Sequence, residues 1–510
     1  MLPPARGALP MSTSEPVLNY ASARHDDTRP ATKIVATIGP ASRSPDMLER
    51  LIRAGLNVAR LNFSHGDFSG HADNIARIRA AEKTTGQRVA IMADLPGPKM
   101  RVGRIEPEPI ELVPGAPFTL TSDDIVGDQQ RVSMSFEPLP RVVKPGDRLY
   151  LNDGLVQLVV ERVQGNDVHC KVTVGGELRS KKGLNLPGID LGISAFTAHD
   201  RACLEFALKH DVDAVSQSFV ETAADIEAVR AAAVEIGRVP FIIAKIERAD
   251  ALNHLDAILQ AADGIMVARG DLGVEVPIEG IAMLQKKIIA QANLVGKPVI
   301  TATQMLESMT TSRLPTRAEA TDVANAILDG TDCIMLSGES AMGHYPEESV
   351  AMLARIAASA EAYRAAERSD AWSVRRRPAP PTNAAEASSE VVEHALTVVP
   401  SAAVIVPTRS GATARMISRF KPGVWIVAVS QDAAVCQALA FSYGVQVVHL
   451  ADEPARWNDF ARNWLSEHQV PGNIAILVAG PSSSNPDANY RLEFLRVGNQ
   501  HGAPSARNMA

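Results

Sequence analysis

The sequence predicts an α/β protein whose main body is a closed (β/α)8 TIM barrel, with a small β-barrel lid domain inserted into it and a separate α/β domain after it. Eight short runs rich in β-branched residues alternate with longer amphipathic segments, which is the order found in a barrel or in an open doubly wound sheet. Polar or charged residues directly follow most of these runs. At 510 residues, the chain is also too long for one ordinary domain.

The eight runs are expected to be the barrel strands, and the segments between them to be helices. Two segments carry clear helix signals: SPDMLERLIRAG (44–55), and TAADIEAVRAAAVEIG (222–237), which opens with a Thr/Asp capping pattern and closes with Gly. The predicted strands are Lys33–Ile38, Val58–Leu61, Val89–Ala93, Ala214–Ser218, Phe241–Ala244, Gly264–Val267, Pro298–Ala302 and Cys333–Leu336.

The residues that follow the strands distinguish a barrel from an open sheet. In a barrel the carboxyl ends of all strands meet at one face, where such enzymes carry out chemistry, whereas an open sheet would spread them along a line. A barrel is favoured because it gathers the polar residues into one site. They are Asn62 and Ser64 after the second strand, Asp94 after the third, Lys245 and Glu247 after the fifth, Asp271 after the sixth, Thr303 and Gln304 after the seventh, and Ser337 and Glu339 after the eighth.

Two interruptions divide the chain into domains. Residues 104–189 contain short alternating strands with Gly, Pro and Asp turns, such as VVKPGDRLYLNDGLVQLVV, and predict the inserted lid. The Pro/Ala-rich stretch 371–389 predicts a linker. The barrel is therefore assigned to 31–103 and 190–370, and the C-terminal α/β regulatory domain to 390–500. Residues 1–30 are expected to be a disordered tail and 501–510 a second tail, with either Met1 or Met11 as the start.

The composition argues against several classes of protein. A formal net charge of −7 is mild for this length and argues against a nucleic-acid or anionic-membrane partner. No apolar run reaches the roughly 18–20 residues of a membrane-spanning helix, and the N-terminus lacks the apolar core of a signal peptide. The four cysteines have no CxxC spacing, as expected for a reduced, cytoplasmic protein without a structural zinc site.

Lys245 follows the hydrophobic run FIIA, at a position where a lysine is costly unless it is paired. Glu247 lies two residues on, and Asp271, in MVARGDLG, follows the next strand. Two carboxylates at neighbouring strand ends suit a hard divalent ion, and a cation beside such an ion suits a phosphoryl group or an enolate. Taken singly, Lys245 and Glu247 would be a plain ion pair and Asp271 a helix cap. Their convergence favours a functional site.

Two further motifs add polar groups to the same face. NVARLNFSHG supplies Arg60, Asn62, Ser64 and His65, and a planar arginine beside small polar groups is a good anion clamp. A strand-end turn with a surface arginine stays open as the alternative. ITATQMLESM places Thr303 at the seventh strand, where threonine is often only a strand residue. Neither a Walker P-loop nor a Rossmann glycine motif is present, so a bound nucleotide would depend on metal and basic side chains.

These motifs resemble the pyruvate kinase family. The resemblance covers about residues 31–500 and rests on TKIVATIGPAS, GLNVARLNFSHG, IIAKIE, VARGDLGVEVP, TATQMLESM and PTRAEATDVANAILDGTDCIMLSGESA. It implies a barrel, a β lid and a C-terminal domain in a homotetramer. It also implies transfer of the phosphoryl group of phosphoenolpyruvate to ADP, giving ATP and pyruvate, with Mg²⁺ or Mn²⁺ as cofactor.

The resemblance implies a role for each matching residue. Lys245 would stabilise charge on the phosphoryl group in transfer, and Glu247 and Asp271 would bind the metal. Protonation of the enolate would pass through water held by Thr303 and Ser337. The implied substrate-binding residues are Arg60, Lys245, Ala268, Arg269, Gly270, Asp271 and Thr303, and the implied nucleotide-binding residues are Asn62, Phe63, Ser64, His65, Arg101 and His199.

One departure from the family pattern concerns potassium. Many members carry a glutamate five residues after the third-strand aspartate and bind K⁺ at positions matching Asn62, Ser64, Asp94 and the carbonyl of Leu95. Lys99 replaces that glutamate here. Because its ammonium group brings a permanent positive charge to this place, we expect the enzyme not to require K⁺.

Two other departures affect ligand binding. His199 stands where a lysine is common, so the nucleotide contact there is in question and would depend on pH near neutrality. TRSGATA matches the family's effector-phosphate loop, with Thr408, Ser410, Gly411 and Thr413 offering hydroxyl and backbone N–H groups. Ala412 stands where an arginine is common. A sugar-phosphate effector is therefore plausible, but the sequence does not identify it.

Two other functions compete with this interpretation. A metal-dependent barrel aldolase of pyruvate chemistry would also carry acidic residues at successive strand ends, but it would need neither Lys245, the lid nor the C-terminal domain. A catalytically silent metabolite sensor of the same fold should have lost the lysine or a metal ligand, and this sequence has lost neither.

Overall fold

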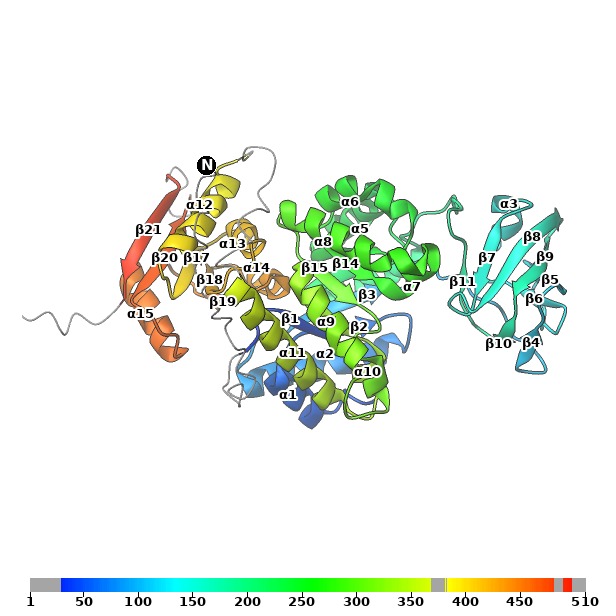
Figure 1. Cartoon of the computed structure of the whole chain (residues 1–510), viewed down its shortest axis with the longest axis horizontal. Helices are drawn as coiled ribbons and strands as arrows, with labels where there is room; N and C mark the ends of the chain where they lie inside the picture. The colour runs from blue at the N-terminus through cyan, green and yellow to red at the C-terminus, as the bar shows by residue number, and fades with distance from the viewer. Residues whose placement is uncertain (1–28, 368–380, 382, 481–488, 498–510) are drawn as a thin grey trace, which may run out of the picture.

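The computed structural model describes residues 29–367, 381, 383–480 and 489–497. Figure 1 shows three bodies in a row, with the inserted β domain at one end, the helix-covered barrel in the middle and the C-terminal α/β domain at the other end. Most of the predicted N-terminal tail with its two candidate start sites, the tail 501–510 and much of the predicted linker lie outside the described residues.

The middle body is a closed barrel of parallel strands in the order β1-β16-β15-β14-β13-β12-β3-β2, which confirms the predicted fold class. All eight predicted runs form its strands, with ends that differ by a few residues. The strands are β1 (Lys33–Thr37), β2 (Leu56–Asn62), β3 (Ala90–Leu95), β12 (Ala214–Gln217), β13 (Phe241–Ile246), β14 (Gly264–Ala268), β15 (Val299–Ala302) and β16 (Cys333–Leu336).

Helices surround the barrel, and capping residues mark where they begin and end. Ser44 accepts a hydrogen bond from the Met47 backbone at the start of the first helix, and Gly55 ends it with a φ of 119°. Thr222 and Asp225 form the predicted capping box on α5. The helices are α1 (Pro45–Ala54), α2 (Phe68–Thr85), α4 (Ala198–Lys209), α5 (Ala223–Ile236), α6 (Leu255–Ala261), α7 (Arg269–Glu275), α8 (Ile281–Leu294), α9 (Arg317–Asp329), α10 (Gly338–Ala341) and α11 (Pro346–Glu367).

The inserted β domain leaves the barrel after β3 and returns before α4. It consists of a six-stranded sheet in the order β11-β7-β8-β9-β5-β6 and a two-stranded sheet of β10 and β4. Because β3 ends at the carboxyl face of the barrel, the insertion stands over that face. Its elements are β4 (Ile110–Leu112), β5 (Pro117–Thr121), β6 (Arg131–Ser133), α3 (Leu139–Val142), β7 (Arg148–Leu151), β8 (Val156–Gln164), β9 (Asp167–Val174), β10 (Gly176–Leu178) and β11 (Leu184–Asn185).

The C-terminal domain is a five-stranded sheet in the order β19-β18-β17-β20-β21, parallel except for its last strand. Helix α12 (Ala384–Val398) begins inside the range predicted to be a linker, because Asn383 caps it by accepting a hydrogen bond from the Glu386 backbone. The other elements are β17 (Ala403–Pro407), α13 (Ala412–Ser418), β18 (Trp425–Ser430), α14 (Ala433–Ala438), β19 (Val445–His449), α15 (Trp457–Glu467), β20 (Ile474–Ala479) and β21 (Arg491–Arg496).

The C-terminal domain closes the amino-terminal end of the barrel. Phe441 is fully buried and stacks on Phe241 of β13, with ring centroids 5.3 Å apart. Lys33, at the start of β1, donates a hydrogen bond of 2.8 Å to the carbonyl of Val445. The opposite, carboxyl end of the barrel is therefore the end available for a site. None of the helices in the described part of the chain has both the length and the apolar character needed to cross a bilayer.

Candidate active site

The interior of the barrel changes from apolar to polar toward its carboxyl end, because alternate residues of each strand point inward. On β13, Phe241 and Ile243 belong to the apolar interior cluster, whereas Ile242, Ala244 and Ile246 pack outward under the helices. Lys245 is the next inward residue and lies within the strand, which continues to Ile246. The same two-residue step occurs on β2, where Arg60 is the inward residue after Val58, and on β3, where Asp94 is the inward residue after Met92. Arg60, Asp94 and Lys245 of this polar layer thus lie within the strands themselves.

Lys245 lies at the centre of this polar layer and is only 8% exposed. Its Nζ donates to Ser218 Oγ at 2.6 Å and to Glu247 Oε1 at 2.8 Å, and it lies 3.3 Å from Asp94 Oδ1. Burial by itself would lower the pKa of the lysine, but Asp94 and Glu247 outweigh burial and raise the pKa to about 12. The ammonium group therefore stays charged in neutral solution.

Arg60 and Asp94 form the second buried pair of the layer. Arg60 Nε donates to Asp94 Oδ2 at 2.8 Å, and its Nη1 donates to Thr37 Oγ1 at 2.8 Å. Ser216 Oγ donates to the other carboxylate oxygen at 2.7 Å. Burial by itself would raise the pKa of Asp94, but Lys245 and Arg60 lower it to about 2. Asp94 is thus an ionised anchor that fixes both cations.

Glu247 and Asp271 approach each other at the same mouth. Glu247 Oε2 accepts the Phe219 backbone N–H at 2.8 Å. Burial raises the pKa of Glu247, Lys245 opposes that rise, and the nearby Asp271 adds to it. The Asp271 carboxylate makes no hydrogen bond or ion pair with the residues that the structure describes. Two close carboxylates, one of them without a partner, fit a divalent metal ion.

The donor set also fits the kind of metal. Within the described ranges, no group of three or more His, Cys, Asp or Glu side chains could hold a metal ion. A site of two carboxylates leaves most positions to water and substrate oxygens, which is how Mg²⁺ is usually bound in phosphoryl-transfer sites. The layer holds two cations, Arg60 and Lys245, against three carboxylates, so a divalent ion would turn its charge from −1 to +1.

Thr303 is held in a strained conformation beside the same mouth. Its φ is 72°, and that of Gln304 is 54°, values that residues other than glycine adopt only uncommonly and that are most strained for a β-branched residue such as Thr303. Thr303 Oγ1 accepts the Gly270 backbone N–H at 2.7 Å and donates to the Ala302 carbonyl at 2.6 Å. Gly270 and Asp271 at the start of α7 are thereby fixed to the end of β15. Strain of this kind is typical of functional sites.

The Arg269 side chain is already engaged by other protein groups. It donates to Asp322 of α9 at 2.8 Å and to the carbonyl of Thr303 at 2.7 Å. Arg269 and Ala268 can therefore contribute to a bound substrate only through their backbone.

The loop after β2 lies beside the polar layer. Asn62 Oδ1 accepts the Ser64 backbone N–H at 3.1 Å, and the Phe63 N–H donates to the carbonyl of Asp94. Burial lowers the pKa of His65, and so do the nearby cations Arg101 and Lys99. The predicted nucleotide-side residues 62–65 and Arg101 are therefore neighbours, with Lys99 among them.

The inserted β domain reaches this region at two places. Arg101 pairs with Gly183 in an isolated bridge and donates to the carbonyl of Lys181 at 2.9 Å. A methyl group added at Gly154, whose φ is 87°, would lie 3.4 Å from Val274 of α7. A turn of the insertion thus touches the helix that begins with Arg269 and carries Asp271.

The remaining residues predicted from the sequence lie outside the polar layer or in the C-terminal domain. His199 is in the first turn of α4, where its Nε2 lies 3.7 Å from Cys203 Sγ. The Ser337 N–H donates to Glu339 Oε2 at 2.7 Å. Thr408, Ser410, Gly411 and Thr413 lie between β17 and the start of α13, in the C-terminal domain beyond the closed end of the barrel. They do not belong to this site.

Sequence reasoning missed several members of the layer. Thr37, Ser216 and Ser218 hydrogen-bond to Arg60, Asp94 and Lys245, but a serine or threonine within a strand carries no motif. A second buried charge cluster was also missed. The Arg248 side chain is 2% exposed, lies 3.2 Å from Glu221 and 3.7 Å from Glu275, and donates to the Ile189 carbonyl at the return of the inserted domain. Only the register of β12 could have indicated the serines.

Two family models match the chain. "Pyruvate kinase, barrel domain" matches residues 29–350, and "Pyruvate kinase, alpha/beta domain" matches residues 386–489. The first match alone covers more than half of the chain.

Individual proteins are similar over most of their length. A protein named pyruvate kinase from Thermococcus litoralis is 50% identical over 419 residues, which are 81% of this chain and 87% of that protein. A pyruvate kinase from Geobacillus stearothermophilus is 42% identical over 459 residues, covering 88% and 77% of the two chains. The crystal structure of a pyruvate kinase from Cryptosporidium parvum superposes with a TM-score of 0.83 at 36% identity, covering 92% and 96%.

Proposed function

The chain belongs to the pyruvate kinase family of phosphotransferases, which move the phosphoryl group of phosphoenolpyruvate to ADP, and we propose that the polar layer at its barrel mouth performs this transfer. One observation carries the proposal. The ammonium group of Lys245 lies 2.8 Å from Glu247, whose carboxylate neighbours that of Asp271. A fixed cation and a divalent-ion site therefore face the same small volume.

Lys245 acts as a fixed positive charge for the migrating phosphoryl group. The transition state of phosphoryl transfer is loose, so it needs positioning and charge rather than a protein nucleophile. Asp94 and Ser218 fix the direction of the ammonium group, and the raised pKa keeps it protonated. Because it is buried in the barrel, its charge is weakly screened and acts strongly on the transferred group.

Glu247 and Asp271 would hold the divalent metal, which we propose to be Mg²⁺ or Mn²⁺. When bound, the ion neutralises charge on the phosphoryl and enolate oxygens. The unpartnered carboxylate of Asp271 is the residue most available to it. Glu247 already accepts from Lys245 and from the Phe219 backbone, which sets the orientation of its carboxylate.

Arg60 and the start of α7 would hold the substrate. The Arg60 guanidinium has five N–H groups, of which the Asp94 and Thr37 contacts use three, leaving two for the phosphate. Thr303 and the backbone of residues 268–271 would hold the carboxylate. Proton delivery to the enolate would pass through water near Thr303 and Ser337, whose hydroxyl makes no hydrogen bond within the described residues.

ADP would bind on the side of residues 62–65 and Arg101, under the inserted domain. This side is positively charged, because Arg101, Lys99 and Arg60 are near enough to His65 to lower its pKa. His199 is assigned to the same side from the family motif alone.

We also propose that the enzyme works without potassium. Lys99 supplies a permanent cation beside His65 and Arg101, where Asn62, Ser64, Asp94 and the Leu95 carbonyl would otherwise bind K⁺. Asp94 is in addition already satisfied by two side-chain cations.

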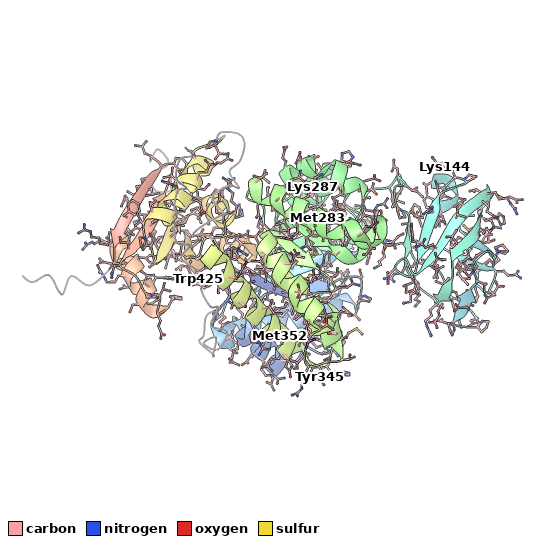
Figure 2. All side chains as sticks on the ribbon, viewed as in Figure 1. Lys144, Met283, Lys287, Tyr345, Met352 and Trp425 are labelled. Carbon is pink, nitrogen blue, oxygen red and sulfur yellow. The ribbon has the colours of Figure 1, made fainter. Side chains whose placement is uncertain are left out.

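Lys99→Glu tests the potassium proposal directly. Wild-type activity should persist in buffer free of K⁺ and NH₄⁺, and Lys99→Glu should acquire a K⁺ requirement. Lys144→Glu, at an exposed lysine of the inserted domain (Figure 2), is the matched control and should leave the ion dependence unchanged. Loss of wild-type activity in K⁺-free buffer would overturn this proposal.

Assembly, regulation and location are the remaining proposals. A homotetramer is supported by the exposed apolar side chains Ile278 and Met283 near the start of α8, which are 69% and 62% exposed (Figure 2 labels Met283). The loop 408–413 would bind an effector phosphate, since Gly411 has a φ of 77° and its N–H is held by Thr408. All four cysteines are free and buried, which suits the reducing cytoplasm.

A coupled assay separates this function from its rivals. Pyruvate formed from phosphoenolpyruvate and ADP is measured with lactate dehydrogenase, with and without divalent metal. A pyruvate kinase requires ADP and metal. A silent metabolite sensor would form no pyruvate, and an aldolase would form it from other substrates without ADP.

A further inference from the structure

Arg248 directly follows the proposed metal ligand Glu247 in the chain, yet its own side chain is almost completely buried, at 2% exposure. A buried arginine is costly unless its charge and its N–H groups are matched by nearby groups. The partners of Arg248 come from three other parts of the molecule. Each of them belongs either to the inserted domain or to an element that holds a proposed metal ligand.

The first partner is the backbone of the inserted domain. Arg248 Nη2 donates a hydrogen bond of 2.8 Å to the carbonyl of Ile189. The side chain of Ile189 belongs to the apolar core of the inserted domain, together with Leu186 and Leu191. Figure 1 shows this domain joined to the barrel by extended segments near β11. The hydrogen bond from Arg248 therefore holds one of these segments to a strand end of the barrel.

The second partner lies on the helix that carries Asp271. Glu275 is the last residue of α7 and is buried, and its Oε2 lies 3.7 Å from Arg248 Nε. Helix α7 has only seven residues, and Asp271 stands about one turn before Glu275. A shift of the end of this short helix therefore moves the Asp271 carboxylate with it.

The third partner follows the backbone group that orients Glu247. Glu221 Oε1 lies 3.2 Å from Arg248 Nε. Two residues before Glu221, the Phe219 N–H donates to Glu247 Oε2 at 2.8 Å. Phe219 has a φ of 58°, which is uncommon for a residue other than glycine. Arg248 thus also fixes the loop that sets the direction of the Glu247 carboxylate.

The contact between Arg248 and Glu275 is not fully formed. Neither Arg248 Nε nor Glu275 Oε2 has a hydrogen-bond partner in the part of the chain that the structure describes, although both atoms are buried. Buried polar groups are normally hydrogen-bonded. The two atoms lie 3.7 Å apart, just beyond hydrogen-bond distance, so a small movement of α7 toward Arg248 would pair them. The position of α7 is therefore adjustable at the contact that links it to the inserted domain.

We propose that Arg248 is a positioning residue that couples the inserted domain to the carboxylates of Glu247 and Asp271, so that divalent metal steadies the inserted domain and an intact contact with that domain strengthens metal binding. This inference rests on the metal site proposed above. Coupling between two sites is reciprocal in binding free energy. A single guanidinium can carry it, because its planar fork presents Nη2 to the inserted domain and Nε to Glu221 and Glu275.

Mn²⁺ titration of the full-length chain, followed by electron paramagnetic resonance, tests the effect on metal binding. The titration is run at pH 8, above the pKa of about 7 to which burial raises Glu275, so that this carboxyl group is ionised. Arg248→Met should weaken Mn²⁺ binding about tenfold or more, the usual effect of removing a group that orients a metal ligand.

Asp271→Asn is measured alongside, to separate this inference from the function on which it rests. If Asp271→Asn binds Mn²⁺ as the wild type does, the metal site itself is wrong. If Asp271→Asn weakens binding and Arg248→Met does not, the metal site stands and the positioning role of Arg248 is overturned.

A double variant separates positioning from stability. Arg248→Met alone leaves buried carboxylates without their cation, which strongly destabilises a protein. Arg248→Met combined with Glu275→Gln removes the arginine and its buried partner together, and neutral replacement of a buried ion pair is often tolerated. Urea unfolding should show that stability recovers in the double variant, whereas its Mn²⁺ affinity should stay low. Recovery of the Mn²⁺ affinity together with the stability would overturn the proposal.

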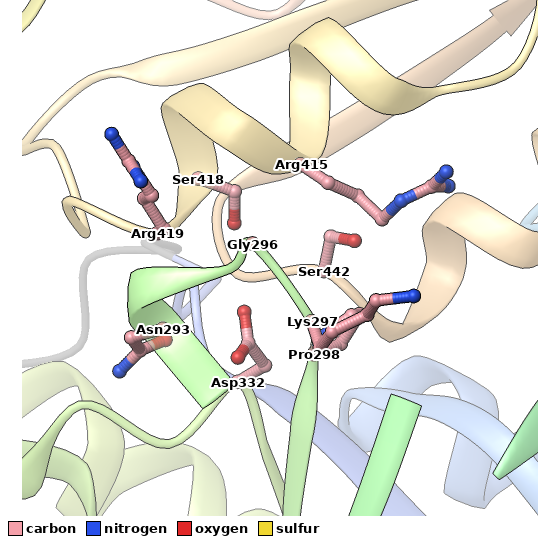
Figure 3. A pocket seen from close by; sticks show the side chains of 9 residues that line it. All are labelled: Asn293, Gly296, Lys297, Pro298, Asp332, Arg415, Ser418, Arg419 and Ser442. Carbon is pink, nitrogen blue, oxygen red and sulfur yellow. The ribbon is translucent and has the colours of Figure 1, made fainter. Parts of the chain in front are cut away.

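Arg419, at the opposite end of the barrel, is the matched control (Figure 3). It too is a buried arginine beside two glutamates, and it donates to a backbone carbonyl of a neighbouring domain. Its distances are 3.7 Å to Glu386, 3.6 Å to Glu390 and 2.7 Å to the Leu294 carbonyl. Arg419→Met should leave the Mn²⁺ affinity unchanged. An equal loss of affinity in Arg419→Met and Arg248→Met would contradict a role specific to Arg248.

Amide hydrogen exchange of the full-length chain tests the effect on the inserted domain. Mn²⁺ should slow exchange in residues 186–192 of the wild type and of Arg419→Met. This protection should be absent from Arg248→Met and from the double variant. Protection that persists without Arg248 would show that the inserted domain responds to metal by another route, and the proposal would be overturned.

Discussion

Replacing Lys245 by methionine removes the central cation of the polar layer while keeping the length of the side chain. The layer then holds one cation, Arg60, against the carboxylates of Asp94, Glu247 and Asp271. Breaking a buried ion pair by removing one partner costs about 3–5 kcal/mol, against a usual total stability of about 5–15 kcal/mol. We therefore expect Lys245→Met to fold, with a lower free energy of unfolding that divalent metal partly restores.

The same substitution should affect the rate more than substrate binding. Removing one fixed group that stabilises developing charge costs about 10²–10³ in kcat, or about 2.7–4 kcal/mol. Arg60 and the backbone at residues 268–271 remain, so the KM for phosphoenolpyruvate should change much less. Both constants come from the lactate-dehydrogenase-coupled assay, and the stability comes from urea unfolding with and without Mg²⁺.

Lys33→Met is the matched control for the loss of a buried lysine. Lys33 is 5% exposed and donates to the Val445 carbonyl at the closed end of the barrel. Its loss should lower the stability without a comparable loss of kcat. A near-normal kcat in Lys245→Met, or an equal loss of kcat in Lys33→Met, would refute the assigned role.

Three further predictions concern stability, packing and metal binding. Burial raises the pKa of Glu275 to about 7, although Arg248 opposes the rise. The free energy of unfolding of the wild type should therefore fall by about 3 kcal/mol between pH 4.5 and 7. Urea unfolding at pH 5 and pH 8 should show that Glu275→Gln lacks this loss. Phe441→Ala should lower the free energy of unfolding by about 3–5 kcal/mol, because it removes a fully buried ring stacked on Phe241. A change under 1 kcal/mol would mean that the C-terminal domain does not seal the barrel. Asp271→Asn should weaken Mn²⁺ binding, measured by electron paramagnetic resonance, about tenfold or more; an unchanged affinity would remove Asp271 from the metal site.

The barrel and the charged members of its polar layer were predictable because two local signals agree. Strand-like runs recur with amphipathic segments between them, and charged residues stand where those runs end. The closed strand order confirms the inference from Lys245, Glu247 and Asp271 that these ends converge. The prediction placed Lys245 just after its strand, whereas it is an inward residue within β13. Hydrophobicity alone ends a strand too early when the barrel interior turns polar.

Other features depend on contacts that no local pattern encodes. Ser216 and Ser218 become part of the site only through the register of β12 against β3 and β13. Phe441 reaches the barrel floor from a separate domain. The cluster of Arg248 and Glu275 joins the end of β13, the last residue of helix α7 and the return of the insertion. Long-range packing of this kind is visible only once the chain is folded.

The central claim is that Lys245 and a divalent ion bracket one phosphoryl-sized volume at the barrel mouth. The most direct measurement is an anomalous-difference map from a crystal grown with Mn²⁺ and phosphoenolpyruvate. We predict a peak between the carboxylates of Glu247 and Asp271, with the substrate phosphate between that peak and the ammonium group. A metal peak elsewhere, or a phosphate out of contact with Lys245, would contradict this account.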